Sequence, residues 1–473
     1  MSEAPGRPGS RRTAGLARAA CLALACLAAA ASAQTGGPER LALTLDEAVR
    51  LALSRSRAAI SVRLGREEQK LSLEAAEERY DPMASVTLGT RAASRGDETA
   101  DLSLGPSLRV PTGGSFSLSF RKPLAGERDR EASTTLSFSQ PLLRGFGTEL
   151  DTQPLRRARL QERIDLRRFR DAAAGIVEGA VSAYRGVLRA GQRLVIAREA
   201  LERARRQLEI NRALVEAGRM APQDLVQTEA DAADKEYALA DAENALETAN
   251  SHLVNTLDLE EGVRIEPQAE PPIEPEQPDL EESLETAFAR RTDWLRAETG
   301  MAFARMGLRS AENALLPDLS LSAEAAHRSG RDLTLWSGGL NLTVPLQNDE
   351  ERRQLTRARN GLRRAEMAIA ETRQSIRIEV RQAVHDVAVA LRQIDLAGQA
   401  RALAERKLDV ERRKLQLGLS SAFQLGRFED DLVNAQRREL DAVARYRDSL
   451  GALDRTLGTT LDRWGISIEQ VGR

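Results

Sequence analysis

Cysteine and aromatic residues are scarce in this chain, and each scarcity excludes a class of protein. Both cysteines, Cys21 and Cys26, lie near the amino terminus, so the rest of the chain has no disulfide, thiolate metal site or cysteine nucleophile. Aromatic residues make up only 3% of the 473 residues, whereas charged residues reach 30%. This composition is typical of long helices and coiled coils, not of a compact globule with a thick core.

Residues for catalysis or cofactor binding are also few. The three histidines, His252, His327 and His385, are far apart and show no ligand spacing. The sequence has no glycine-rich phosphate loop, nucleophile elbow or paired Cys/His motif. The net charge of -2 gives no reason to expect nucleic acid as a partner. We therefore expect no enzyme activity, no catalytic residue, no cofactor and no metal.

Residues 1–33 predict a signal peptide. Several arginines precede an apolar run that ends in the small-residue cleavage motif Ala31-Ser32-Ala33. The run is too short for a bilayer core of about 30 Å. Lipid attachment at Cys26 is a weaker alternative, because Ala23-Leu24-Ala25 is a poor match to a lipid-anchor motif. Since no long apolar stretch follows, a membrane passage would have to be made by β-strands.

The chain contains an internal repeat. The segment Leu45-Asp46-Glu47-Ala48 recurs as Leu280-Glu281-Glu282-Ser283, and Gly218 later recurs as Gly418. Each half predicts a short helix, a helix, strands, a very long helix, a tight turn and a return helix. We place the first repeat at 34–264 and the second at 280–473. The proline-rich linker 265–279 separates them, because its five prolines forbid a regular helix.

Two segments of unusual length carry a helical pattern. They run over about 154–217 and about 350–417, roughly 95 Å and roughly 100 Å at the rise of an α-helix. Apolar residues recur at heptad spacing, with alanines between them, so that two helices can interdigitate closely. The first row is Val187, Leu194, Leu201, Leu208 and Val215 with Ala190, Ala197 and Ala204. The second row is Val387, Ile394, Leu408 and Leu415 with Ala390, Ala397 and Ala404. We predict two antiparallel coiled hairpins, about 154–258 and about 350–458.

Alternating sequence predicts strands at about 83–140 and about 318–346. In 115–120, apolar side chains share one face and serines the other, as in a barrel strand between lipid and water. The first half has four such segments, near 86–90, 102–110, 115–120 and 134–140, and the second has two, near 319–325 and 340–346. The candidate lipid-facing residues are Phe116, Leu118, Phe120, Leu136 and Phe138. A soluble sheet packed on one face would show the same alternation.

In this order, the features resemble the TolC-like outer membrane factor family over essentially the whole length after the leader. The most specific match is the segment 418–425, Gly-Leu-Ser-Ser-Ala-Phe-Gln-Leu, followed by Asn434-Ala435-Gln436 and Leu457-Gly458. The motif Gln140-Pro141-Leu142-Leu143-Arg144-Gly145 closes the first strand region, and Leu315-Leu316-Pro317 leads into the second. Their order, repeated in two halves, is specific.

The resemblance implies an α+β membrane protein with a trimeric TolC-like architecture. Long antiparallel coiled-coil helices would form a periplasmic α-barrel. Two strands per half from each of three copies would form one transmembrane β-barrel of about 12 strands in outer-membrane lipid. The two additional alternating segments of the first half exceed this count, and the sequence does not place them. The implied function is a passive outer-membrane channel of a tripartite efflux or type I secretion system.

The resemblance also implies partners at the hairpin tips. The homotrimer would dock a periplasmic adaptor, which in turn holds an inner-membrane pump. The docking candidates are Gly218, Arg219, Met220, Pro222, Gly418, Ser420 and Leu425. Relatives carry acidic residues at the narrow entrance, whereas this sequence has Gln424 and Arg427 there, with Asp224 on the other hairpin. We therefore take Asp224, Gln424 and Arg427 as gate candidates and predict an Asp224–Arg427 contact.

Two other protein classes share some of these features. A periplasmic adaptor of the membrane-fusion type also has an export signal and a coiled hairpin, but usually one hairpin between lipoyl-like halves. A structural periplasmic coiled coil would lack the serine-alternating strands. The transported substrate leaves no recognisable sequence signal.

Overall fold

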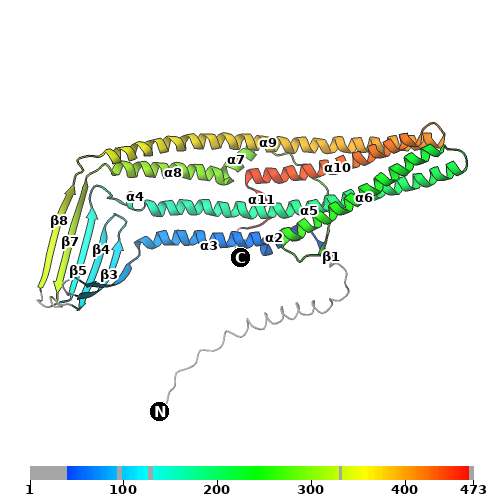
Figure 1. The fold of residues 1–473 in the computed structure, drawn as a ribbon. Coiled ribbons are helices and arrows are strands. Elements are labelled where there is room, and N and C mark those ends of the chain that lie inside the picture. The colour runs from blue at the N-terminus through cyan, green and yellow to red at the C-terminus, as the bar shows by residue number, and fades with distance from the viewer. Residues whose placement is uncertain (1–39, 93–97, 126–130, 330–332, 468–473) are drawn as a thin grey trace, which may run out of the picture.

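The structure, a computed structural model, describes residues 40–92, 98–125, 131–329 and 333–467. The predicted signal peptide lies outside these residues. The chain is strongly elongated, with a β-sheet at one end and two helical hairpins reaching far from it (Figure 1).

The two longest helices span most of that length. Helix α5 covers Gln153–Glu216 and α9 covers Asp349–Gln416. Each reverses at a tight turn into a return helix, α6 (Pro222–Leu257) or α10 (Ala422–Leu457). The long helices and antiparallel hairpins that the sequence predicts are thus confirmed. No helix in the described part of the chain is both long enough and apolar enough to cross a membrane.

The heptad rows form the seams of these hairpins. Val187, Leu194 and Leu201 are 2%, 7% and 4% exposed, and the alanines between them are buried as well. Val387 and Leu408 are similarly buried in the second hairpin. Large and small apolar residues alternate along each seam, so the helices pack without needing aromatic side chains.

Shorter elements join the hairpins to the sheet. Helices α2 (Leu45–Arg55) and α3 (Arg57–Glu77) precede the first strands, and α7 (Leu280–Arg290) and α8 (Thr292–Asn313) precede the last ones. Thr44 and Glu47 form a capping box at the start of α2, and Asp279 caps α7. The remaining short elements are β1 (Arg40–Leu43), η2 (Glu78–Tyr80), α4 (Thr148–Asp151), β6 (Arg264–Pro267) and α11 (Thr460–Arg463). Strands β1 and β6 pair in parallel.

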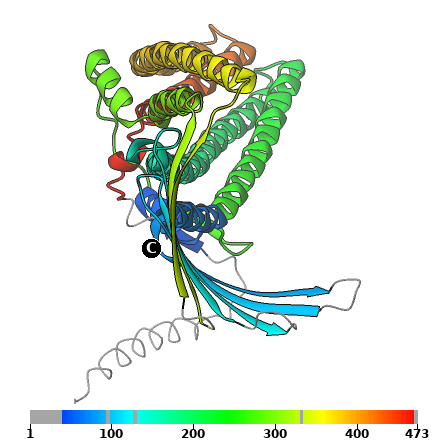
Figure 2. The same cartoon turned by 90° about the vertical axis from the view of Figure 1, so that its left-hand side faces the viewer.

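The other strands form one antiparallel sheet in the order β2-β3-β4-β5-β7-β8. Their bounds are Met83–Ala92, Glu98–Arg109, Ser115–Ala125, Ser133–Pro141, Asp318–Arg328 and Leu333–Thr343. The four strands that alternation predicts in the first half are therefore confirmed, and this half contributes four strands to the sheet and not the two that the resemblance implies. β5 pairs with β7, so residues of the two repeats lie side by side. Figure 2 shows the sheet as a curved wall in which the blue and cyan strands sweep away from the yellow-green pair.

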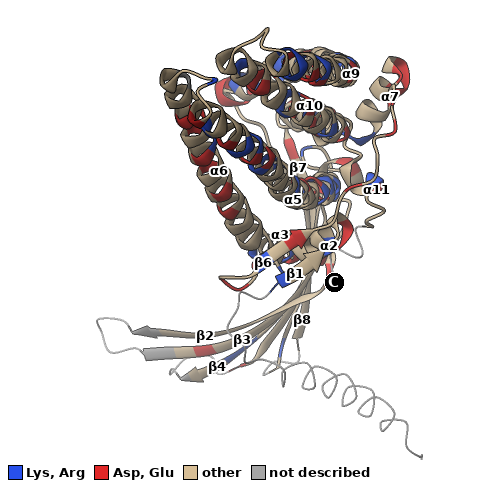
Figure 3. Ribbon diagram, turned by 90° about the vertical axis from the view of Figure 1, so that its right-hand side faces the viewer, with Lys and Arg blue, Asp and Glu red and all other residues tan. Residues whose placement is uncertain are grey.

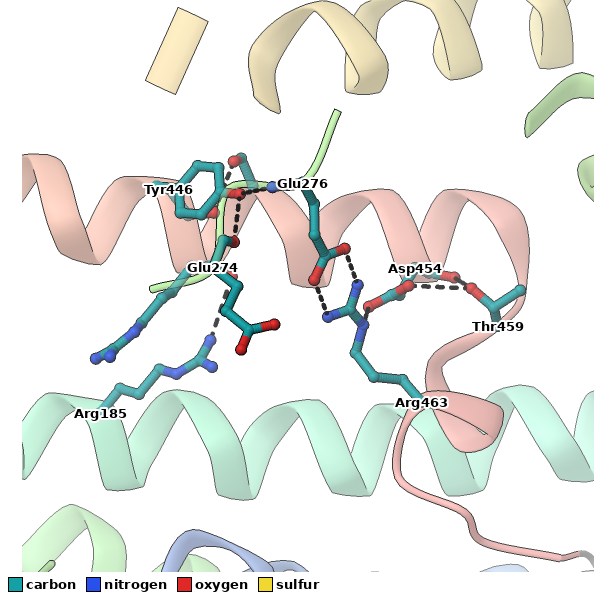
Figure 4. Close-up of polar contacts among 9 residues, drawn as sticks. Arg185, Glu274, Glu276, Tyr446, Asp454, Thr459 and Arg463 are labelled. Atoms are coloured by element: carbon teal, nitrogen blue, oxygen red, sulfur yellow. Dashed lines mark hydrogen bonds and ion pairs between the residues drawn. The ribbon is translucent and has the colours of Figure 1, made fainter. Parts of the chain in front are cut away.

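The proline-rich linker is held against the helices by polar side chains (Figure 4). The Tyr446 hydroxyl of α10 accepts a 2.8 Å hydrogen bond from the Glu276 backbone N–H. Arg463 contacts the Glu276 carboxylate at 2.8 Å and Asp454 at 2.5 Å. Burial raises the pKa of Asp454, although Arg463 acts in the opposite direction. These contacts fix the linker against α10 and α11 although it forms no helix.

Candidate functional site

One face of the sheet is apolar across all six strands. Phe116 and Phe138 stack with ring centroids 4.6 Å apart, and Leu118 lies directly opposite Leu136. The predicted strand residues therefore lie together on this face, and Leu118 and Phe120 are 38% and 37% exposed. Further members from the other strands are Val86, Leu88, Leu102, Leu104, Leu108, Leu321, Trp336, Leu340 and Leu342.

The opposite face is polar. The hydroxyl groups of Ser117 and Ser137 lie 2.6 Å apart across β4 and β5. Asp101 and Arg121 form an ion pair of 3.6 Å on the same face. A sheet with one continuous apolar face and one hydroxyl-rich face can separate hydrocarbon from water.

Both outer edges of this sheet lack a partner strand among the described residues. β2 pairs only with β3, and β8 pairs only with β7. Each edge strand is long, with 10 residues in β2 and 11 in β8. Long unpaired edges present open backbone hydrogen-bonding groups that favour pairing with another chain.

The helices also have an uncovered apolar surface. A row of side chains on α9 is 40–63% exposed, and its last four members are at heptad spacing. The row is Met367, Ile378, Val389, Leu396, Leu403 and Val410. On α6, Val226 and Tyr237 are 65% and 78% exposed. Helices α6 and α9 lie at opposite sides of the helical layer, with α5 and α10 between them (Figure 3).

The predicted glycines form matching caps at the two tips. Gly218 has φ +68° and Gly418 has φ +72°. The N–H of Arg219 donates to the carbonyl of Leu214 at 2.8 Å, and that of Leu419 donates to Lys414 at 2.9 Å. This hydrogen bond, with a left-handed glycine before it, is a Schellman cap, and glycine adopts that conformation without steric cost.

Behind each turn lies a different polar group. In the first hairpin, Asn211 is fully buried and donates a 2.8 Å hydrogen bond to the hydroxyl of Thr228. In the second, Glu411 is 5% exposed and accepts a hydrogen bond from Ser420. That bond, with the ion pair to Lys414, holds the pKa of Glu411 below its usual value. The hydroxyl of Ser420, a predicted docking residue, is thus bonded within its own hairpin.

The other docking candidates differ in exposure. Arg219 and Pro222 are exposed and Met220 is partly exposed, so these side chains are accessible to a partner. Leu425 is 2% exposed and packs against Leu408 and Leu432 inside the hairpin. Its side chain supports the turn from within and does not present a surface to a partner.

An apolar patch at the second tip was not among the predicted site residues. Leu417, Leu419 and Phe423 are 74%, 73% and 56% exposed. The positions that correspond to them in the first tip hold Ala217, Arg219 and Gln223. Comparing the two repeats position by position would have found this difference, because apolar side chains beside a solvent-facing turn have no core to fill.

The structure places the gate candidates near the two tips. The side chain of Asp224 lies outside the described part, so the predicted Asp224–Arg427 contact stays a prediction. Arg427 is exposed and forms no ion pair with a described side chain. The side chain of Gln424 lies 3.1 Å from the hydroxyl of Ser420, which also bonds to Glu411. These three side chains therefore form one polar cluster at the second tip.

The acidic neighbours of Arg427 have other partners. Glu429 pairs with Arg412 at 3.1 Å within the second hairpin. Asp430 pairs with Lys235 of the first hairpin and so links α10 to α6. Burial disfavours the Lys235 ammonium, but Asp430 and Asp231 outweigh this effect and raise the pKa of Lys235. The two hairpins thus share one partly buried ion pair close to their tips.

No group of three or more His, Cys, Asp or Glu side chains that could hold a metal occurs among the residues that the structure describes.

Comparisons with known proteins agree with the geometry. The outer membrane efflux protein family matches the chain twice, over residues 69–257 and 284–459. The outer membrane protein VceC of Vibrio cholerae has a similar fold, with a TM-score of 0.67 and 17% identity over 88% of this chain and 96% of VceC. The Campylobacter jejuni CmeC outer membrane channel gives a TM-score of 0.65 and 17% identity over 88% of this chain and 86% of that chain. The open Neisseria gonorrhoeae MtrE outer membrane channel gives 0.57 and 17%, over 91% and 94%. No curated protein sequence matches the chain.

Proposed function

This chain belongs to the outer membrane efflux protein family, a family of channels and not of enzymes, and we propose that three copies of it form a passive conduit from the periplasm to the exterior. The conduit would serve a tripartite efflux or type I secretion system, with a periplasmic adaptor and an inner-membrane pump as partners. Residues 1–33 would direct export as a signal peptide. Residues 34–264 and 280–473 would be the two structural repeats, joined by the linker 265–279.

The strongest support comes from the sheet. Its exposed apolar face would be stabilised by contact with lipid. Its two edge strands among the described residues, β2 and β8, would each be stabilised by pairing with a further strand. Pairing β8 of one copy with β2 of the next would satisfy both edges. Phe116, Leu118, Phe120, Leu136 and Phe138 would then face outer-membrane lipid.

The helices support the same assembly. The exposed α9 row and the exposed Val226 and Tyr237 of α6 lie at the two sides of the helical layer. In a ring of copies, α9 of one would pack on α6 of the next and remove these apolar groups from water. A single rotational relation between neighbouring copies would therefore bury the exposed apolar rows of α9 and α6 and also pair β8 with β2.

The assembly can be tested in membrane fractions. We expect the chain in the outer membrane as a species that runs as a trimer before heating and as a monomer after it. Purified trimer should open ion-conducting channels in planar bilayers. A soluble monomer without conductance would overturn the proposal, and would favour the adaptor or structural coiled-coil alternatives.

For the adaptor, we propose docking on the tips. The turn glycines Gly218 and Gly418 would set the shape of the surface, and Arg219 and Met220 would contact the partner. The exposed patch Leu417, Leu419 and Phe423 adds an apolar contact on the second tip. Exposed apolar groups of this kind are typical of protein interfaces.

Substitutions at the tips can separate docking from assembly. We expect Leu419→Asp and Phe423→Asp to leave the trimer intact and to reduce site-specific crosslinking to the adaptor at least tenfold. Arg219→Trp and Ser420→Trp should weaken it as well. Val195→Asp, on an exposed site of α5 far from the turn, is the matched control. Unchanged crosslinking across the tip series would exclude docking at this surface.

For the gate, we propose that Asp224 and Arg427 help to hold the tips closed, with Gln424 next to them. Three copies of Arg427 near a threefold axis would repel one another unless neutralised, and Glu429 and Asp430 already have partners. An uncharged or basic entrance would also favour cations less than an acidic ring does.

Single-channel recording tests this gate. Asp224→Ala or Arg427→Ala should increase the open fraction, and Arg427→Asp should increase the preference for cations. Arg437→Ala, a charge change farther along α10, serves as the control. If none of the three gate variants alters conductance or selectivity, Arg427 belongs to the outer, solvated face.

A further inference from the structure

The resemblance implies four strands per copy, whereas the sheet has six. The hairpin β3–β4 accounts for the two additional strands. β2 continues α3 and β5 leads into α4 and α5, while β7 continues α8 and β8 leads into α9. These four strands are therefore the direct continuations of four helices. β3 and β4 lie between β2 and β5 and continue no helix.

We infer that β3 and β4 belong to the channel wall itself, so that the assembly closes an 18-stranded barrel, with six strands from each of three copies. This inference rests on the proposed trimer. It concerns the width of the channel at the outer membrane and not whether a channel exists.

The register argues that this hairpin is a full part of the wall. Val86 of β2 lies opposite Leu104 of β3, and Leu108 lies opposite Phe116 of β4. In the sheet of the described residues, β3 and β4 separate β2 from β5, so β2 joins the wall only through the hairpin. β3 has 12 residues and β4 has 11, as long as the other strands. A tilted strand needs about 9–11 residues to cross a bilayer.

The faces of the hairpin also match those of the wall. Leu104, Leu108 and Phe116 continue the apolar face, and Ser103, Ser117 and Ser119 continue the polar one. If the hairpin folded away from the wall, its two faces would not need to match the apolar and polar faces of the neighbouring strands.

The turn between β3 and β4 is fixed to the base of the helices. The N–H of Gly147 donates to the carbonyl of Thr112 at 3.1 Å, and Gln140 donates to the same carbonyl at 3.0 Å. Gly113 has φ +91°, and a Cβ there would lie 2.6 Å from the carbonyl oxygen of Gly145. Arg109, at the end of β3, forms an ion pair of 2.6 Å with the buried Asp151 of α4. The hairpin is thus anchored like the other strands.

The strand directions permit closure. The six strands alternate in direction, because every neighbouring pair in the sheet is antiparallel. With an even number of strands, β8 of one copy runs antiparallel to β2 of the next. The junction between copies then has the same geometry as the pairs within a copy.

The helical wall is wide enough to accommodate six strands. Near the sheet, α3, α5, α8 and α9 lie side by side (Figure 1), which at about 9 Å between axes makes an arc of about 36 Å. Strands about 4.8 Å apart and tilted by about 40° occupy about 6.3 Å each along the circumference. Six strands then span about 38 Å, which is close to the width of the four helices.

The consequence is a wider outlet. Barrel diameter grows roughly linearly with strand number, so 18 strands give a wall about 1.5 times as wide as 12 strands. Barrels of about this size leave an aqueous channel. The ion pair of Asp101 and Arg121, both on the added hairpin, would line that channel.

Counting strands by electron cryomicroscopy of the purified trimer tests the inference directly. A trimer with 18 strands confirms it, and a trimer with 12 overturns it while leaving the channel function intact. If no trimer forms at all, the proposed function fails first. The two failures are therefore distinguishable.

Cysteine pairs give a second test in a Cys21→Ser, Cys26→Ser background. Thr87→Cys in β2, combined with Ser337→Cys, Gly339→Cys or Asn341→Cys in β8, should form disulfides between copies and yield a ladder that ends at three copies. The matched control combines Thr87→Cys with Thr135→Cys or Ser137→Cys in β5. Three strand spacings of about 4.8 Å keep those pairs too far apart to bridge. Disulfides in the control would place β3–β4 outside the wall, because β2 would then lie beside β5. The pairs between copies form in either arrangement and test the trimer itself.

Discussion

The two hairpin tips have the same backbone and different chemistry. Each ends its long helix with a left-handed glycine, Gly218 or Gly418, and the same capping hydrogen bond. Arg212 contacts Glu229 at 3.1 Å, and Arg412 contacts Glu429 at the same distance. Yet Asn211 is replaced by Glu411, and Arg219 by Leu419. The comparison teaches that the duplicated backbone preserves the turn, whereas the side chains can specialise the tips separately.

In the proposed assembly, this difference would present two kinds of docking surface. A polar first tip with a neutral buried amide and an apolar second tip with a buried carboxylate offer two unlike surfaces in alternation around a ring of copies. An adaptor could then distinguish one docking position from the other. Four predictions sharpen or break this comparison, taken from the largest expected effect to the smallest.

The largest effect should follow a charge placed behind the first tip. Asn211→Asp puts a carboxylate into a fully buried site whose existing contacts are to Gln207 and Thr228. We expect a local cost of about 2–4 kcal/mol, because the ion loses its hydration without gaining a cation. Amide hydrogen exchange in the turn should become about 30-fold to 1,000-fold faster. The matched variant Glu411→Gln should have a clearly smaller effect, and a reversed order would show that the tips do not differ in this way.

The turn glycines should respond alike. Gly218→Ala and Gly418→Ala each force a side chain into the left-handed region, while the added Cβ meets no atom within 4 Å. We expect each to destabilise its own turn by about 1–2 kcal/mol, measured by hydrogen exchange. Asparagine, which tolerates this conformation better, should cost less at both sites. A clear difference between the two sites would mean that the tips do not share one backbone in the assembly.

The repeated arginine–glutamate pairs should differ in strength. Glu229 has a side chain 47% exposed, whereas that of Glu429 is 7% exposed. Removing Arg412 would leave a buried carboxylate without its cation, at a cost of about 1–2 kcal/mol, but Arg212→Ala should cost only about 0.3 kcal/mol. Hydrogen exchange at the two turns measures both, with Arg412→Lys as the conservative control. Equal costs would show that burial in the single chain does not determine these contacts.

Acid should weaken the second tip more than the first. The pKa of Glu411 lies below its usual value of 4.5 in the folded chain, because Ser420 and Lys414 stabilise the carboxylate. Its contribution is therefore present above the unfolded pKa and is lost as the pH falls through the folded pKa. After correction for intrinsic rates, protection of the second turn should fall below pH 4.5 relative to the first, where Asn211 does not titrate. Glu411→Gln should abolish this relative change, and its persistence in that variant would implicate another group.

Much of the helical architecture was predictable because its signals are local. Heptad spacing identified the seam through Val187, Leu194 and Leu201, and two isolated glycines marked the turns. Alternation placed Phe116, Leu118 and Phe120 on one face. Helix periods, glycine caps and strand alternation depend on neighbouring residues, so one sequence is enough to detect them.

Tertiary structure alone decided what depends on distant residues. The pairing of Leu136 with Ala325, the single sheet that includes β3 and β4, and the ion pair between Lys235 and Asp430 join segments far apart in the chain. No periodicity encodes such partners, because strand order and side-chain contacts depend on how whole elements pack. The same reason explains why Leu425 turned out to be buried while Leu419, six residues before it, is exposed at the turn.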